Sequence, residues 1–457
     1  MTNEGGTVAS LTVRRREYIA PPIHWDDIIA RAEANNEPNW LIEMRQAAWE
    51  IYEQTPMPTL RDESWRRTDY RSINWDQAGH IFVTENPDVN LIPAENRAPL
   101  IGEEQGALLA WVDSALAHQE LNEQLDTQGV ICTDLHTAVA QYPDLVQKYL
   151  FQKAVRPEEG KFAALHVAAW THGLFVYVPR NVKVALPLHS IFYNTGNGAS
   201  LGHVLIVVDD GAEVTVLQEY LSTEGEAHSS YIGGTELLVG KGADLKYVSL
   251  QKWGHNFYDF SHGRGHVERD GRLDWVVGSM GSQLTKNFMQ ISLDGQGAWG
   301  RMSGMFFADG DQLLDHDTLQ VHNVPHTTSD LLFKAVLKDH AHSVWRGMIR
   351  VMPGAIKSDG FQANNNMLVS STARADSIPG LEIEADDVRC THAATVGKME
   401  EQYIFYLMTR GVPRIEAERL FINGYFWDVL ERIPFEEVQN RLLADVDAKL
   451  LGKHESL

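Results

Sequence analysis

The pattern of apolar and polar positions changes twice along the chain. Up to about residue 155, apolar side chains recur mainly with the period of a helix, as in residues 40–52. From 156 to 388, short apolar runs alternate with turns rich in Gly, Asp and Asn, and helical spacing returns afterwards. We therefore expect a mostly helical N-terminal region at 1–155, a β core at 156–388 and a C-terminal helical region at 389–457. The helical spacing expected within 103–152 rests on the apolar residues Leu108, Val112, Leu116 and Leu121.

Short strands at a regular spacing make up the expected β core. The turns at 209–212, 240–243, 269–271 and 294–297 recur every ~24–31 residues. A sandwich, a barrel and a solenoid all offer many short strands, but a repeated length favours a parallel β-helix, in which inward side chains form ladders. The flanking helical regions would cap its ends. Strands are expected at 174–178, 182–186, 203–208, 213–219, 235–239, 244–250, 273–277, 287–293 and 298–307.

Three helices are expected after residue 400. Gly411 suits the C-cap of the first helix and Pro413 the first turn of the second, and a third helix follows Pro434. Their apolar faces are longer than the capping of a solenoid requires. These faces could bind a partner, or they could pack on one another as an ordinary bundle.

Charge and composition exclude several classes of protein. The chain of 457 residues carries 39 Lys and Arg against 62 Asp and Glu, a net charge of −23, which disfavours binding to nucleic acids or anionic membranes. No apolar run reaches the ~18–20 residues of a membrane span. The two cysteines cannot form a disulfide scaffold, and the cytoplasm is the expected compartment. Residues 1–12 resemble a frayed tail, and no signal-peptide core follows the basic residues 14–16.

Several side chains could carry chemistry. Asp315, Asp317 and Asp330 could serve a carbohydrate-active β-helix enzyme as paired carboxylates, although acidic residues are also common in turns. Three groups of histidines lie close together in the sequence: His255, His262 and His266; His316, His322 and His326; and His340 and His342. His340 and His342 could point the same way from one strand, but nothing fixes a metal geometry, and we expect the histidines to occupy polar positions on a solvent-facing sheet. The chain contains neither a Gly-x-Ser-x-Gly elbow nor a phosphate-binding loop.

The sharpest local feature is Cys390 followed by His392. Residues two apart share one face of an extended segment, and a thiolate beside an imidazole suits iron, zinc or a sulfur-handling step. Two ligands cannot complete a metal site, so a partner chain or a small thiol would have to complete it. The alternative is a buried thiol beside a hydrogen-bonded histidine. The other cysteine, Cys132, is expected to serve packing.

Several sequence blocks resemble the SufB/SufD family of iron–sulfur cluster assembly proteins. The resemblance covers most of residues 60–435 and is most specific in its C-terminal part. Its blocks are SDLLFKAVL at 329–337, VWRGMI at 344–349, LEIEADDVRCTHAATVG at 381–397 and FYLMTRG at 405–411, with weaker matches at 177–182 and 65–70.

Within this family, the chain resembles the D-type subunit. B-type subunits carry a cysteine near an Asn/Gln-rich run, and the matching residues 362–368 contain none. B-type subunits also read His-Glu-Ala-Thr where this chain has His392-Ala393-Ala394-Thr395. D-type subunits usually have Gly after the histidine, so Ala393 is a departure that could narrow the space beside the imidazole.

The resemblance implies a scaffold and not an enzyme. It implies a right-handed β-helix between helical regions, and pairing with a B-type sister subunit and with two copies of the SufC ATPase, which would dock on the C-terminal helices. His392 would bind iron or a transient Fe–S cluster at the subunit interface together with a cysteine of the partner, and Cys390 is a secondary candidate. No permanently bound cofactor is expected. Unpaired edge strands would also permit a homodimer of isolated chains. A carbohydrate-active enzyme and a pure interaction module remain as alternatives.

Overall fold

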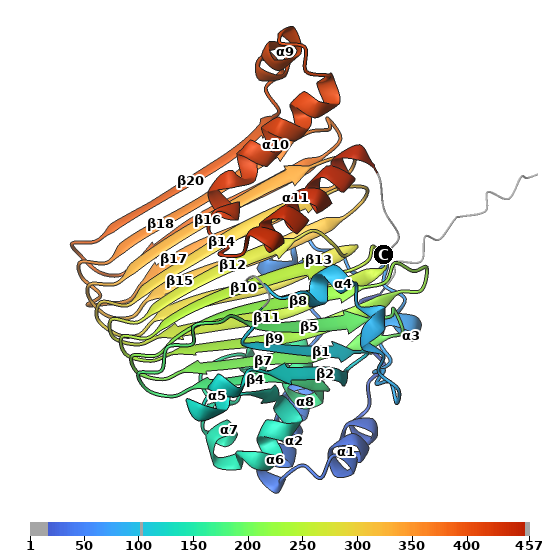
Figure 1. Cartoon of the computed structure of the whole chain (residues 1–457), viewed down its shortest axis with the longest axis vertical. Coiled ribbons are helices and arrows are strands. Elements are labelled where there is room, and N and C mark those ends of the chain that lie inside the picture. Colours follow the sequence, from blue (N-terminus) through green and yellow to red (C-terminus); the bar gives the residue numbers. More distant parts are fainter. Residues whose placement is uncertain (1–16, 101–103, 453–457) are drawn as a thin grey trace, which may run out of the picture.

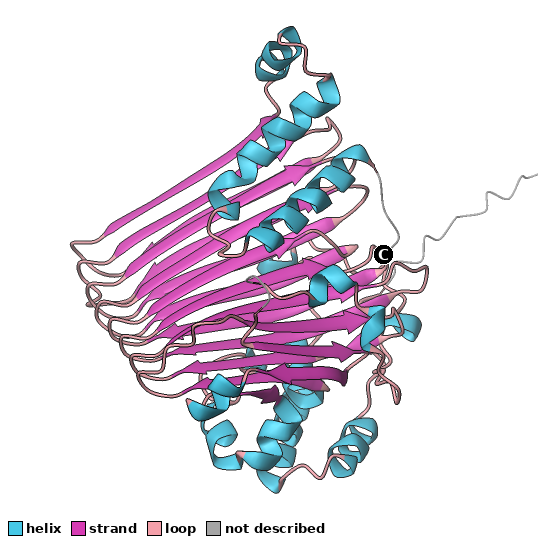
Figure 2. Ribbon diagram, viewed as in Figure 1, coloured by secondary structure: helices cyan, strands magenta, loops and turns pink. Residues whose placement is uncertain are grey.

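Two long sheets of stacked, mostly parallel strands run along the molecule (Figure 1). The structure is a computed structural model that describes residues 17–100 and 104–452, so the expected tail at 1–12 and the basic residues 14–16 lie outside the described residues. The chain is mainly β, and its strands form a β-solenoid of about eight turns with helices at both ends (Figure 2). This confirms the predicted solenoid with helical flanks.

Successive strands from β7 onward alternate between the two sheets, so each coil adds one strand to each sheet. In spatial order, the first sheet consists of β2 (Ala115–Leu121), β1 (Ala107–Val112), β5 (Leu188–Asn194), β8 (Glu213–Ser222), β10 (Asp244–Lys252), β12 (Arg272–Ser279), β14 (Trp299–Ala308), β16 (Thr328–Leu337), β18 (Asp359–Leu368) and β20 (Arg389–Lys398). The second sheet consists of β19 (Arg374–Ile383), β17 (His342–Val351), β15 (Leu313–His322), β13 (Leu284–Leu293), β11 (Phe257–Val267), β9 (Ser229–Val239), β7 (Gly202–Val208), β4 (His172–Val178) and β3 (Ile131–Asp134), with the short β6 (Ala199–Ser200) beside β9.

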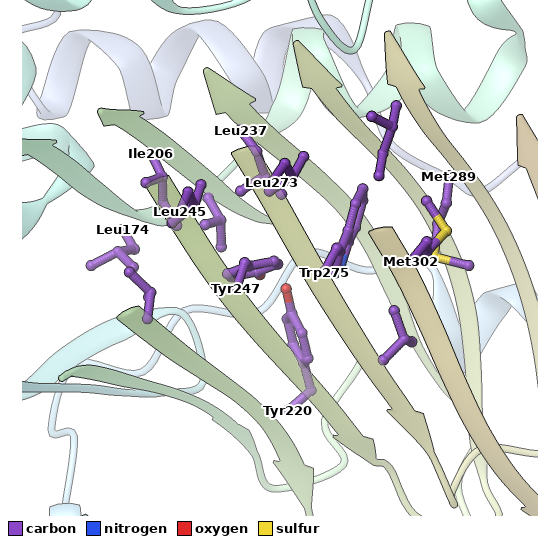
Figure 3. Packing of buried hydrophobic residues seen from close by; sticks show 14 of the residues in the cluster. Leu174, Ile206, Tyr220, Leu237, Leu245, Tyr247, Leu273, Trp275, Met289 and Met302 are labelled. Atoms are coloured by element: carbon purple, nitrogen blue, oxygen red, sulfur yellow. The ribbon is translucent and has the colours of Figure 1, made fainter. Parts of the chain in front are cut away.

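The inward side chains stack in ladders because equivalent strands pair in register. One ladder of the first sheet consists of the successive register partners Val216, Tyr247, Trp275, Met302 and Leu331. All five are buried, and together with inward residues of the second sheet they form the main hydrophobic core (Figure 3). Removing this apolar surface from water is the main force that holds the coils together.

Helices cover the outer faces of both sheets. The N-terminal helices α1 (Trp25–Ala34), α2 (Asn39–Gln54) and α8 (Lys161–Ala169) belong to a second core against the second sheet, where Phe162 stacks on Phe260. The C-terminal helices α10 (Arg414–Leu430) and α11 (Glu436–Leu451) pack on the outer face of the first sheet, where Phe426 and Leu442 join Met305. The remaining helices are α3 (Trp75–Ala78), α4 (Ala94–Arg97), α5 (Glu123–Thr127), α6 (Leu135–Gln141), α7 (Pro143–Tyr149) and α9 (Glu401–Thr409), with 3-10 turns at Glu63–Trp65, Val89–Leu91 and Pro157–Glu159.

Three expectations about individual elements were wrong. Residues 107–121 form the hairpin β1–β2 and not a helix, because Asp113 and Ser114 adopt positive φ angles of 44° and 66° in a two-residue turn. Residues 182–186 form no strand, and only Lys183 makes an isolated bridge, to Glu213. Strand β20 begins at residue 389, where the C-terminal helical region was expected to start.

No helix among residues 17–100 and 104–452 combines the length and apolar character needed to cross a bilayer.

Several histidines are buried in the neutral form. Burial lowers the pKa of His166 and His322 to about 4 and that of His172 and His316 to about 3. It also lowers the pKa of His203 well below its ordinary value. His166 Nδ1 lies 2.9 Å from the carbonyl oxygen of Ile232, and its Nε2 lies 2.9 Å from His203 Nδ1, so neutral rings tie α8 to the sheet.

Acid should therefore destabilise the fold between about pH 6.5 and pH 4. In this range the unfolded chain binds protons on these histidines and the folded chain does not, so the free energy of unfolding falls as the pH falls. Each such histidine contributes up to about 1.4 kcal/mol per pH unit. Burial raises the pKa of five carboxyl groups among the described residues, which act in the opposite direction: Glu236, Asp244, Asp259, Asp317 and Asp445. The histidines whose pKa burial lowers are more numerous, because His228, His262 and His342 join the five named above.

Denaturant unfolding at pH 7 and pH 5 measures this effect. His316 offers a specific variant, because its ring stacks on Phe306 at 4.1 Å and neither ring nitrogen has a hydrogen-bond partner among the described residues. His316→Phe should keep the stack and reduce the pH dependence by about 1 kcal/mol per pH unit. An unchanged pH dependence in the variant would contradict a neutral, buried His316.

Candidate functional site

Cys390 and His392 lie on the last strand of the first sheet, β20, and not after the strands as expected. Their register partners on β18 are Gly360 and Gln362. A Cβ atom built on Gly360 would lie 3.3 Å from Cys390 Sγ and 3.2 Å from Ile349 Cγ2, which faces inward, so the thiol points into the solenoid. Since alternate residues of a strand share a face, His392 points the same way.

Cys390 is a half-buried thiol in an apolar setting. It packs against a small cluster that contains Ile349, Val351 and Ala355. Burial raises the pKa of its thiol above the ordinary value, and a hydrogen bond involving the backbone of Gly360 offsets this only in part. A protonated thiol is a poor nucleophile and a poor metal ligand, so Cys390 is not poised for either role in the free chain.

The side chain of His392 is exposed at the end of the solenoid and makes no hydrogen bond or ion pair with any described residue. It continues the ladder of the main core, since Leu331 pairs with Gln362 and Gln362 with His392. The imidazole therefore sits at the open end of the interior, where either ring nitrogen can bind a metal. Ala393 points to the opposite face of the strand, so its methyl group does not narrow the space beside the imidazole.

The end of the solenoid around His392 is open. Strand β19 is the edge of the second sheet and β20 the edge of the first. Leu381, Ile383 and Val396 are 36%, 43% and 48% exposed on these two strands, which is unusual for residues of this type in a β core.

A metal site at His392 would need further ligands. Among the described residues, no group of three or more His, Cys, Asp or Glu side chains is placed to hold a metal ion. Protein sites for iron or zinc use three or four such ligands, and β20 offers two at most. The arrangement suits a shared site in which a second molecule supplies the remaining donors.

The three candidate carboxylates do not form a catalytic pair. Asp315 and Asp317 lie on β15 of the second sheet, and Asp330 lies on β16 of the first. The Nζ atom of Lys286 lies 3.0 Å from Asp315 Oδ1 and 2.8 Å from Asp317 Oδ2, and Lys286 and Asp315 are fully buried. These acids neutralise a buried lysine, so the carbohydrate-active alternative has no geometric support.

The remaining candidate histidines do not form a metal site. His340 lies in an exposed turn, while His342 Nε2 lies 3.0 Å from Asp376 Oδ2, so the two do not form a site. His262, His316 and His322 are buried, and the expectation of solvent-facing positions was wrong for them.

The structure also places the second cysteine, Cys132, and a residue that the sequence did not predict, Gln362. Cys132 is buried on β3, where burial raises its pKa to about 12. Gln362 was not predicted as a site residue, because residues 362–368 were considered only for the presence of a cysteine. The sequence feature that could have identified Gln362 is its alternation with Asn364 and Asn366, which places three amide side chains on one face of a strand.

Comparisons with known proteins agree with one another. A family model described as "SUF system FeS cluster assembly, SufBD core domain" matches residues 191–425, and one described as "SufBD protein N-terminal region" matches residues 29–189. The chain is 31% identical over 426 residues to the iron–sulfur cluster assembly protein SufD of Bacillus subtilis, which covers 92% of this chain and 96% of that protein. It is 27% identical over 429 residues to a SufBD family protein of Staphylococcus epidermidis, which covers 90% of each chain. A SufBD family protein of Staphylococcus aureus is 28% identical over 425 residues, which covers 89% of each chain.

The environments of the two thiols predict different reactivities. Native protein treated with iodoacetamide should be alkylated slowly at Cys390 at pH 7, and faster as the pH rises, because the thiolate is the reactive form. Cys132 should stay unmodified until the protein unfolds. Mass spectrometry of the peptides measures both. Alkylation of Cys390 at pH 7 as fast as that of an activated thiolate would contradict the structure.

Proposed function

The chain belongs to the SufBD family of iron–sulfur cluster assembly proteins, and from this premise we propose that it is a D-type, non-catalytic scaffold subunit. The observation that carries the proposal is His392, an exposed imidazole on the edge strand at the open end of the solenoid. Iron and sulfide are substrates that arrive at this end and leave as a cluster. The similarity to a SufD protein and the absence of a cysteine in residues 362–368 favour the D-type over the B-type.

The partner at the open end is a B-type sister subunit. Strands β19 and β20 offer unpaired backbone groups and exposed apolar side chains, and a homologous solenoid can continue both sheets by strand addition. His392 then faces the partner, whose cysteine completes the site with a soft sulfur ligand suited to iron. The same unpaired edge also permits a homodimer of isolated chains.

The C-terminal helices are the docking surface for the SufC-type ATPase. Helix α9 lies beyond the last strand (Figure 1), and Tyr403, Phe405 and Tyr406 on it are 49%, 67% and 55% exposed. Helix α10 adds Trp427, which is 53% exposed. Aromatic side chains exposed on a helix are typical of a protein interface. The opposite side of α10 packs on the first sheet, and α9 contacts α10 through the stacked rings of Tyr403 and Phe421.

Replacement of His392 tests the site. In a complex reconstituted anaerobically from this chain, the sister subunit and the ATPase, His392→Ala should lower cluster assembly by about tenfold or more. His340→Ala is the matched control, because His340 is also exposed but lies in a turn before β17. The visible absorbance of the cluster, divided by the amount of complex, is the readout. Undiminished assembly in His392→Ala would remove this residue from the mechanism.

Replacement of Phe405 tests the docking surface. Phe405→Asp should abolish co-purification of the ATPase without lowering the melting temperature, because the side chain has little burial to lose in the free chain. Leu91→Asp is a control, since Leu91 is 47% exposed in the N-terminal region. Capture of the ATPase at an equal level by the Phe405 variant and the unmodified chain would place the docking surface elsewhere.

A further inference from the structure

On the first sheet, the inward side chains change from apolar to amide one strand before His392. The inward positions of β16 are occupied by Leu331, Phe333 and Ala335, and their register partners on β18 are Gln362, Asn364 and Asn366. The three amide residues are 0%, 1% and 4% exposed. Burying an amide is unfavourable unless its polar atoms are hydrogen-bonded. The amide nitrogens of all three side chains donate hydrogen bonds, while Gln362 Oε1 and Asn366 Oδ1 have no partner among the described residues.

Gln362 reaches across the interior from one sheet to the other. Its Nε2 donates to the carbonyl oxygen of Gly380 on β19 at 2.9 Å and to that of Gly347 on β17 at 3.4 Å. Gln362 belongs to β18 of the first sheet, whereas both carbonyl groups belong to the second. A single side chain therefore ties the two sheets together directly beneath His392, its register partner on β20.

The other two amides extend this connection. The Ser377 hydroxyl of β19 donates to Asn364 Oδ1 at 2.7 Å, which is a second tie between the sheets. Asn366 Nδ2 donates to Asn364 Oδ1 at 2.6 Å and to the carbonyl oxygen of Thr395 on β20 at 3.3 Å. The three amides thus connect β18 to both terminal strands, β19 and β20.

We propose that Gln362 is the positioning residue of the His392 site. Its amide fixes β19 against β18, and β18 is the strand with which β20, the strand that carries His392, pairs. The inference rests on the proposed function of His392 and adds a residue to it. Strands β19 and β20 have a neighbouring strand on one side only, so they lack half of the backbone pairing that holds inner strands in place. The Gln362 amide compensates in part for this missing backbone pairing by linking the two sheets. It does so beside His392, the ligand that a shared metal site needs accurately placed.

A buried glutamine elsewhere in the interior provides a matched control. Gln320 lies on β15, is also 0% exposed, and neither of its amide atoms has a hydrogen-bond partner among the described residues. Methionine has nearly the length and volume of glutamine and no hydrogen-bonding amide. Gln362→Met therefore removes the tie between the sheets, while Gln320→Met removes a buried amide that ties nothing.

The experiment compares these variants in the full chain and in the reconstituted anaerobic complex. In Gln362→Met, amide hydrogen exchange in β19 and β20 should be about tenfold faster. The yield of cluster per complex should fall severalfold, and the absorption spectrum of the remaining cluster should change. Gln320→Met should leave the exchange in these strands, the cluster yield and the spectrum as they are. If Gln362→Met does not fold, Ser377→Ala removes the second tie and should produce smaller changes in the same direction.

The outcomes separate this inference from the proposed function. Full cluster yield with an unchanged spectrum in Gln362→Met, together with loss of the cluster in His392→Ala, would overturn the positioning role and leave the function standing. An equal loss in Gln362→Met and Gln320→Met would also overturn it, because general loosening of the core would then explain the result. If His392→Ala assembles clusters normally, the proposed function itself fails.

Discussion

Hydrogen bonding between stacked parallel strands is the constraint on which the rest of this structure depends. Every inner strand pairs its backbone on both sides, and only the strands at the two ends of the solenoid cannot. At the N-terminal end, β2 pairs antiparallel with β1 and β3 with β4, beside the N-terminal helical region. At the other end, β19 and β20 are edges with exposed side chains. The two ends differ in exposure: β2 and β3 are mostly half-buried or buried, whereas β20 is almost entirely exposed, which makes the C-terminal end suited to a partner.

The chemistry of the site follows from its position at that end. His316 and His322 inside the molecule are held neutral by burial, and each has a partner: His316 stacks on Phe306, and His322 lies beside Thr327 and Ser329. His392 stands at the top of the same kind of ladder but has no strand above it. His392 occupies a position that would be buried in an inner coil, and it is exposed because the solenoid ends at β20. A second subunit can extend both sheets and complete the site.

The regular spacing of turns in the sequence was enough to predict the solenoid. Features that depend on contacts between different coils could not be predicted. The alternation of a strand was enough to place Cys390 and His392 on one face. The prediction of secondary structure failed for β1, because a strand that is buried on both faces has no alternating pattern of apolar and polar residues. The raised pKa of Cys390 depends on Ile349, which lies in an earlier coil, and the reach of Gln362 to Gly347 and Gly380 depends on the register of three strands. Such contacts are not visible in a single sequence.

The most direct test of the central claim is to locate iron in the assembled complex. Crystals of the anaerobic complex loaded with iron, measured at the iron absorption edge, would give an anomalous map in which each iron atom is a separate peak. The account predicts a peak within coordination distance of a ring nitrogen of His392, at a contact between β20 and a cysteine-bearing sister subunit. Iron bound in the partner alone, with His392 facing solvent or protein and no metal near it, would contradict the account.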